Sequence, residues 1–132
     1  MAKITGGCLC GAIRYETISE PSFQCLCYCT DCQTVSGAAG YAAYGVPLDS
    51  LVITQGDPAA YDVQADSGRM NSRRFCPTCG TRSYALLEEM GLVTVNGLTL
   101  DNREHFQPGM IHMPESAPAW CQLDEKLSVL PG

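Results

Sequence analysis

Nine cysteines in a chain of 132 residues limit what it can fold into more than any other feature of the sequence. The amino terminus has no apolar segment that would direct export, and no run of 18 apolar residues occurs, so we expect a soluble, cytoplasmic protein outside the membrane. Because thiols stay reduced in the cytosol, so many cysteines indicate metal binding or redox chemistry before a disulfide framework.

A CxxCG motif, Cys76-Pro77-Thr78-Cys79-Gly80, lies in the second half of the chain. Its tight turn brings two sulfurs toward one metal ion, and the glycine lets the backbone curl beneath them. A structural zinc needs four ligands, and Cys8-Leu9-Cys10 can supply two more because residues two apart in an extended chain project to the same face. We therefore predict a closed zinc site made of Cys8, Cys10, Cys76 and Cys79; the alternatives are that these cysteines pack as small buried side chains or form adventitious disulfides.

A denser cluster, from Cys25 to Cys32, has four cysteines within eight residues. Cys27, Cys29 and Cys32 combine an extended pair with a turn, a spacing that can place three sulfurs on one ion and leave a fourth position for water or substrate. We therefore expect two zinc ions per chain and expect the catalytic residues to be Cys27, Cys29 and Cys32. A second purely structural metal site is the alternative, whereas three ligands disfavour an iron-sulfur cluster.

The remaining sequence predicts a mainly β fold of short strands with few or no long helices. Alternating or β-branched segments bounded by turn residues predict strands at 12–18, 23–29, 41–46, 51–54, 61–63, 72–75, 82–87 and 92–95. We expect a short helix over 30–36 that ends at Gly37, and a brief helical stretch within 84–90. The length predicts one domain over 1–132, with its core at about 4–120 and an irregular proline-rich tail from Gln107.

The charge of the chain argues against one class of partner. The formal net charge is -6. Seven zinc-bound thiolates and two Zn²⁺ would make it roughly -9. Such a surface repels phosphate backbones, so we expect no nucleic acid partner.

Three motifs carry a specific resemblance: GGCLCGAIRYE, CYCTDCQTVSG and RRFCPTCGTRS, in this order. Together they closely resemble the glutathione-dependent formaldehyde-activating enzyme (Gfa) family, also called the centromere protein V family, from Ile4 to about Trp120. The resemblance implies an Mss4-like, mainly β architecture built around a structural metal. By this similarity Cys8, Cys10, Cys76 and Cys79 match the structural-zinc ligands, and Cys27, Cys29 and Cys32 match the catalytic-zinc ligands. Cys25 and Cys121 lie outside the matched positions.

The resemblance also implies an activity, the reversible addition of a small thiol such as glutathione to formaldehyde or another small aldehyde. The chain would then be a carbon-sulfur lyase similar to S-(hydroxymethyl)glutathione synthase. Zinc would lower the pKa of a bound thiol or water and could polarise the aldehyde oxygen, although three thiolate ligands weaken the second effect. Two other functions fit the cysteines: a noncatalytic zinc-stapled binding module, and a thiol-redox or zinc-storage protein.

Histidines and arginines offer further candidates for the site. His112, in the segment Met-Ile-His-Met, and His105 are the two histidines from which a general base could come. Arg73 and Arg74 could attract a carboxylate such as that of glutathione. Since adjacent strand residues face opposite ways, at most one of these arginines should point into a given cleft.

Three polar residues lie close in sequence to the second cysteine cluster. Asp31, Gln33 and Ser36 could donate or accept hydrogen bonds around that metal. Helix capping explains Asp31 almost as well.

Overall fold

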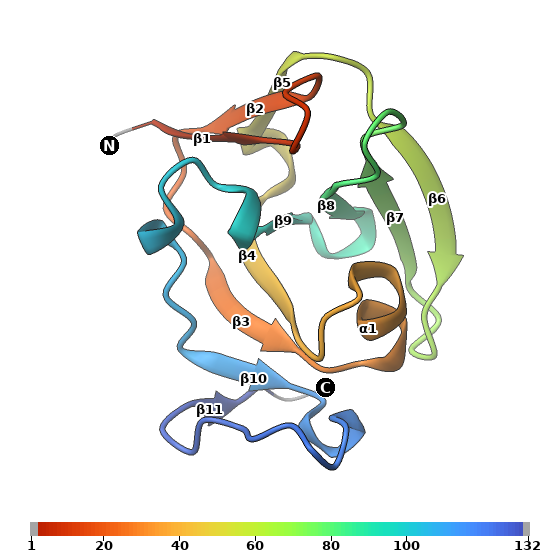
Figure 1. Ribbon diagram of the computed structural model, residues 1–132, viewed down its shortest axis with the longest axis vertical. Coiled ribbons are helices and arrows are strands. Elements are labelled where there is room, and N and C mark those ends of the chain that lie inside the picture. Colours follow the sequence, from red (N-terminus) through yellow and green to blue (C-terminus); the bar gives the residue numbers. More distant parts are fainter. Residues whose placement is uncertain (1–2, 131–132) are drawn as a thin grey trace.

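Two β-sheets form the framework of the molecule, as Figure 1 shows. The coordinates are a computed structural model that describes residues 3–130. The smaller sheet has the strand order β1-β2-β5, from β1 (Ile4–Gly7), β2 (Arg14–Thr17) and β5 (Leu51–Gln55). The larger sheet has the order β11-β10-β3-β4-β9-β8-β7-β6. Its strands are β3 (Phe23–Cys27), β4 (Tyr41–Pro47), β6 (Ala59–Gln64), β7 (Met70–Phe75), β8 (Arg82–Leu87), β9 (Leu92–Asn96), β10 (Met110–His112) and β11 (Ser128–Val129).

Helical structure is sparse in the described part of the chain. The α-helix there is α1 (Thr30–Ser36). The 3-10 turns are η1 (Leu48–Ser50), η2 (Glu88–Met90), η3 (Gly97–Thr99), η4 (Arg103–His105) and η5 (Pro114–Ser116). Across residues 3–130, no helix has the length and apolar character needed to cross a membrane. The prediction of a mainly β fold is confirmed.

The strand predictions hold within a few residues for all eight segments, and the helix spans 30–36 as expected. The helical stretch expected within 84–90 is limited to η2, because residues 84–87 continue β8 and pair with β9. Three strands were not predicted, namely β1, β10 and β11. Of these, β10 matters most, since it pairs in parallel with β3 and brings His112 opposite Cys27.

The main hydrophobic core lies where one face of the larger sheet meets the smaller sheet. Tyr15 from β2 packs there against residues such as Tyr44, Val46, Val93 and Val95, all almost completely buried. These side chains alternate along β4 and β9 with residues that point to the opposite face of the sheet. That opposite face carries a second cluster, which includes cysteines from β3 and α1.

Candidate metal centres

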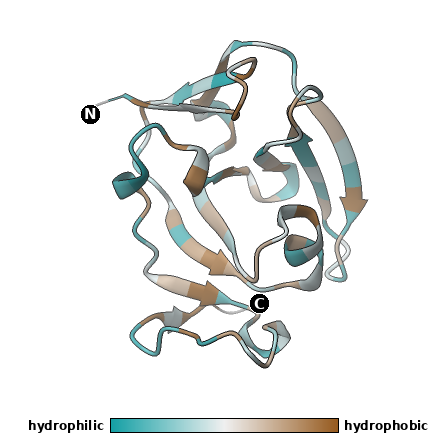
Figure 2. Ribbon diagram, viewed as in Figure 1, coloured by the Kyte–Doolittle hydropathy of each residue, from teal (hydrophilic) through white to brown (hydrophobic). Residues whose placement is uncertain are grey.

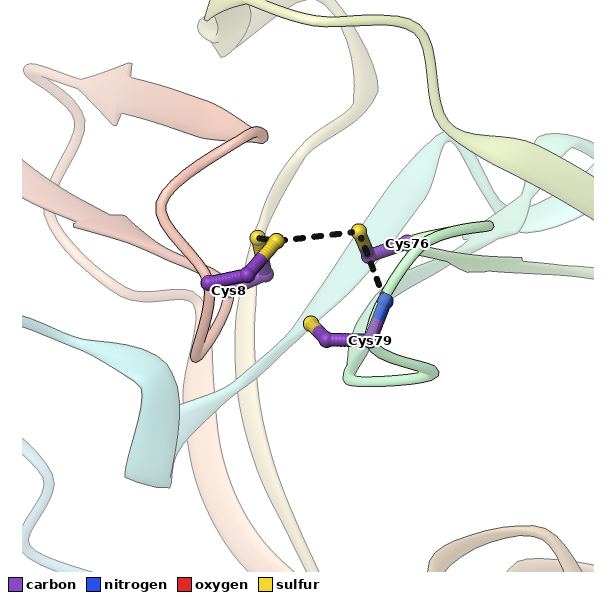
Figure 3. A group of neighbouring side chains, drawn as sticks. Cys8, Cys76 and Cys79 are labelled. Carbon is purple, nitrogen blue, oxygen red and sulfur yellow. Dashed lines mark hydrogen bonds between the residues drawn. The ribbon is translucent and has the colours of Figure 1, made fainter.

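The Sγ atoms of four cysteines from distant parts of the chain lie within 4.8 Å of one another, and we call them the four-cysteine group: Cys8, Cys10, Cys76 and Cys79 (Figure 3). Sγ of Cys10 lies 3.6 Å from that of Cys8 and 3.7 Å from that of Cys76. A tetrahedral zinc with sulfurs at about 2.3 Å requires sulfur-sulfur separations of about 3.8 Å, far longer than the roughly 2.05 Å of a disulfide. The sulfurs therefore fit a single tetrahedral ion.

Two turns build the four-cysteine group. Cys76 to Gly80 forms the expected turn, closed by a hydrogen bond from the Gly80 N–H to the Cys76 carbonyl at 2.8 Å, with Gly80 at a φ of 79°. Cys8 to Gly11 is also a turn, in which the Gly11 N–H donates to the Cys8 carbonyl at 3.1 Å. The extended geometry predicted for Cys8 and Cys10 is therefore wrong, because the chain turns as soon as β1 ends.

Hydrogen bonds to sulfur stabilise thiolates in this group. The Ile13 N–H donates to Sγ of Cys8 at 3.2 Å, and the Cys79 N–H donates to Sγ of Cys76 at 3.4 Å. Oγ1 of Thr81 lies 3.2 Å from Sγ of Cys79. The hydroxyl and then the backbone N–H of Thr81 lower the pKa of Cys79 to about 5, which favours a thiolate at neutral pH. Such partners orient cysteine ligands around a cation.

A second set of sulfurs, the three-cysteine group of Cys27, Cys29 and Cys32, also lies within 4.8 Å. Cys27 ends β3, Cys29 caps the amino terminus of α1, and Cys32 lies in its first turn. The Cys32 N–H donates to Sγ of Cys29 at 3.2 Å, and Sγ of Cys32 lies 3.6 Å from that of Cys27. Cys32 is buried, whereas Cys27 and Cys29 are half-buried.

Charge within the three-cysteine group favours a cation. Hydrogen bonds from Cys27 and then Cys32 lower the pKa of Cys29 to about 2, so its sulfur ionises first. The pKa of Cys27 is strongly raised, chiefly because its thiol is hydrogen-bonded to Cys29 and Cys32. Without a cation, each thiolate disfavours ionisation of the next cysteine. Three thiolates therefore require a positive ion between them. The donor set fits zinc.

The three-cysteine group has no fourth ligand from the described residues. Within 3–130, no further His, Cys, Asp or Glu donor atom lies within 4.8 Å of all three sulfurs. His112 contacts one of the three sulfurs, since its Nδ1 lies 3.3 Å from Sγ of Cys27. It does not lie within 4.8 Å of all three. One of the two candidate histidines thus contacts a sulfur, whereas His105 lies in η4 and lines a surface depression that includes no cysteine.

The polar residues beside α1 serve the helix and its surroundings. Cys29 takes the N-cap position, so Asp31 lies in the first turn and does not cap the helix. The Gln33 amide donates to the carbonyls of Tyr28 and Ser116 at 2.8 and 2.9 Å, which fastens α1 to the η5 turn. The Ser36 hydroxyl donates to the Cys32 carbonyl at 2.6 Å. None of these hydrogen bonds reaches a sulfur.

The two neighbouring arginines of β7 diverge, as the alternation of a strand requires. Arg73 is 4% exposed, and its positive charge acts on the sulfurs of Cys29 and Cys32. Arg74 donates a hydrogen bond from Nε to Oγ of Ser72 at 2.9 Å. Its positive charge interacts with Tyr84, which belongs to the main core. The charge of a third arginine, Arg82, also interacts with Cys32. Sequence reasoning missed this arginine.

The two unmatched cysteines stay outside both groups. Cys25 is buried on β3 opposite Ala43, where it packs in the cluster that surrounds Cys32. Burial raises its pKa to about 11, so it is a neutral thiol at neutral pH. Cys121 is half-buried and makes only a long contact of 3.9 Å to the Gln122 carbonyl.

Similarity to known proteins is found in the family profile, in a single relative and in a solved structure. The sequence profile of the glutathione-dependent formaldehyde-activating enzyme family matches residues 3–116. A protein of Halomonas elongata, provisionally named a glutathione-dependent formaldehyde-activating enzyme, is 26% identical over 129 residues, which cover 93% of this chain and 82% of that protein. A crystal structure of a Rhodobacter sphaeroides protein matches with a TM-score of 0.59 at 23% identity, over 79% of this chain and 96% of that chain, and shows a shared fold.

Proposed function

Because the chain belongs to the glutathione-dependent formaldehyde-activating enzyme family, we propose that it adds a small thiol reversibly to formaldehyde or another small aldehyde. Glutathione is the first thiol to consider, since the family is named for it. The enzyme would be a carbon-sulfur lyase similar to S-(hydroxymethyl)glutathione synthase. Zinc would be held at both cysteine groups, by four sulfurs in one and by three in the other.

One observation supports this proposal most strongly, namely the different number of sulfurs in the two groups. Four cysteines complete a tetrahedral site, as in structural zinc centres, whereas three leave a position for a ligand from solution. Cys27 and Cys29 are half-buried, so solvent reaches part of the three-cysteine group; exposure does not distinguish it from the four-cysteine group, where Cys10 is exposed. We therefore assign the chemistry to the three-cysteine group and a stabilising role to the four-cysteine group.

The reaction needs no oxidant. The thiol loses its proton, sulfur bonds to the aldehyde carbon as the carbon-oxygen π bond opens, and the oxygen takes up a proton. Zinc, when bound, supplies a positive charge that favours a thiolate near neutral pH. The protein's part is to orient the sulfurs: the Cys32 N–H holds Sγ of Cys29, and the Nδ1 atom of His112 contacts Sγ of Cys27.

Exchange NMR spectroscopy tests the activity, because it measures how fast formaldehyde moves between its free hydrate and the hydroxymethyl adduct of glutathione. We expect the zinc-loaded protein to raise this rate above the spontaneous one. Cys32→Ala should lower the enzymatic rate at least about 100-fold, since it removes a sulfur from the reacting group. Cys121→Ala, a cysteine outside both groups, should leave the rate unchanged.

Two results would oppose the proposal. A fully zinc-loaded protein that exchanges formaldehyde no faster than buffer would favour a noncatalytic zinc-stapled module. Reversible oxidation of the three-cysteine group, with loss of zinc and no exchange, would favour the redox or zinc-storage function.

A further inference from the structure

Unsatisfied buried polar atoms in residues 3–130 are confined to β7 and β8. They are Oδ1 of Asn71, Nε of Arg73, Nε of Arg82 and Oγ of Ser83. Arg73 is the most unusual of these residues, since it is 96% buried and forms no ion pair with any residue in 3–130. Charged side chains are almost never buried unless they are paired, because a guanidinium removed from water loses several kcal/mol of hydration. The Nε donors of Arg73 and Arg82 therefore lack a hydrogen-bond acceptor among the described residues.

The register of the larger sheet puts Arg73 on the face that carries the three-cysteine group. Residues opposite each other on antiparallel strands share a face. Across β8, β9, β4 and β3, the residues in register with Arg73 are Ala85, Thr94, Gly45 and Phe23. Cys27 lies four positions after Phe23 on β3 and shares its face. The positive charge of Arg73 acts on Cys29 and Cys32, so its side chain extends along this face toward α1.

An irregularity in β8 brings a second guanidinium to the same face. Between the pairs Arg74–Tyr84 and Phe75–Arg82, β8 contains one more residue than β7, namely Ser83. In a regular strand Arg82 would face away from Arg73, but the inserted residue places it opposite Phe75 on the face of Arg73. The Arg82 backbone is fixed there by a hydrogen bond from the Asn96 amide to its carbonyl at 2.9 Å.

The two arginines bring two positive charges to the three-cysteine group. Burial and then the nearby charge of Arg73 lower the pKa of Arg82, so the guanidiniums repel each other. Three thiolates with one Zn²⁺ carry a formal charge of -1. Two guanidiniums exceed this by one positive charge before a thiol binds, and a fourth thiolate at the zinc would balance it. Figure 2 shows β7 as largely hydrophilic, although its Arg73 is buried.

We propose that Arg73 and Arg82 form a subsite for the carboxylate group of the thiol substrate, beside the three-cysteine group. The subsite rests on the proposed function, which supplies the thiol. A carboxylate matches the planar fork of a guanidinium and accepts two parallel hydrogen bonds from it, so it would supply acceptors for the unsatisfied Nε atoms of Arg73 and Arg82. Substrates of this class carry a thiol and a carboxylate on one small molecule, as glutathione does.

Thiol binding to the cobalt-loaded protein tests the subsite without turnover, because cobalt-thiolate absorption reports each added sulfur. The probes are mercaptoacetate and 3-mercaptopropionate, compared with neutral 2-mercaptoethanol after correction for the ionisation of each thiol. We expect the carboxylates to bind at least about tenfold more tightly. Arg73→Gln and Arg82→Gln should each abolish most of this preference and leave the affinity for 2-mercaptoethanol within about twofold. Arg74→Gln, on the opposite face, is the matched control and should retain the preference.

Equal affinity of the wild-type protein for charged and neutral thiols would overturn the subsite. An Arg73→Gln variant that loses the same affinity for both kinds of thiol would also overturn it, because the arginine would then only balance the charge of the thiolates. If Arg73→Gln does not fold, Arg73→Lys and Arg82→Gln decide the question, since lysine keeps the charge but loses the two-pronged geometry.

Exchange measurements separate this inference from the proposed function. A binding preference without catalysed exchange would contradict the function and support the subsite. Catalysed exchange with equal kcat/KM for charged and neutral thiols would contradict the subsite and support the function. A preference for glyoxylate over formaldehyde, with none among thiols, would place the carboxylate on the aldehyde and overturn the assignment to the thiol.

Discussion

Backbone N–H groups orient several of the cysteine sulfurs. N–H groups two or more residues away donate to Sγ in Cys8, Cys29 and Cys76. A donor at sulfur orients the cysteine as a ligand. Side chains contribute at two further sulfurs, through Thr81 at Cys79 and His112 at Cys27. The ligands are thus held in place by local structure as well as by any metal.

Replacement of His112 tests whether its contact with Cys27 matters. We expect His112→Ala to weaken zinc binding at the three-cysteine group about 10- to 100-fold, since partners of metal ligands typically contribute that much. Competition with a chromophoric chelator measures this affinity.

The control for this substitution is His105→Ala, because His105 lies in η4, apart from the sulfurs. Its zinc affinity should equal that of the wild-type protein. Identical affinities in both variants would mean that His112 only packs beside Cys27.

Turns between strands, more than the strands themselves, position the sulfurs. The four-cysteine group joins the turn after β1 to the turn between β7 and β8, and so links the two sheets. The three-cysteine group depends on β3 and α1, which are adjacent in the chain. A metal adds most to stability where it joins segments that are far apart in the chain.

Two substitutions separate these roles. Cys79→Ala breaks the link between the sheets, and we expect a melting temperature lower by about 10 °C or more, or an insoluble protein. Cys32→Ala should lower the melting temperature by less than about 5 °C and remove one zinc, because neighbouring segments still hold β3 and α1. Thermal melts with metal analysis decide between these outcomes; the reverse order would mean that the two groups have been assigned the wrong roles.

Sequence patterns predicted most of the elements because most strands here are β-branched or alternating. β1 was missed because it ends in two glycines, which strands usually avoid. Gly6 is needed there since a Cβ would lie 2.6 Å from the Thr99 carbonyl oxygen. β10 was missed because it has only three residues and is a strand only through its pairing with β3.

The cysteine ligands of the candidate site could be predicted from their spacing in the sequence. Two short motifs and one cluster were enough to divide seven cysteines into sets of four and three, as the structure arranges them. Arg82 could not be predicted, because the single inserted residue Ser83 decides which face it joins. Nor could sequence say which of Arg73 and Arg74 faces the sulfurs, since alternation fixes only that they differ.

At the scale of the whole molecule, the two cysteine groups lie in different structural settings. The four-cysteine group has its own small cluster with Ile13, near the end of the smaller sheet. The three-cysteine group lies on the face of the larger sheet that is turned away from the main core, together with Arg73 and Arg82. Chemistry at this face would leave the main core undisturbed.

X-ray absorption at the zinc edge tests the central claim, that one site is closed and the other is open, most directly. Seven sulfurs shared by two zinc ions predict an average of about 3.5 sulfurs per zinc in the protein alone. Saturating glutathione should raise the average to about 4 by adding one sulfur at the three-cysteine group. An average that is already 4 without thiol, or that stays at 3.5 with it, would contradict an open site for the thiol substrate.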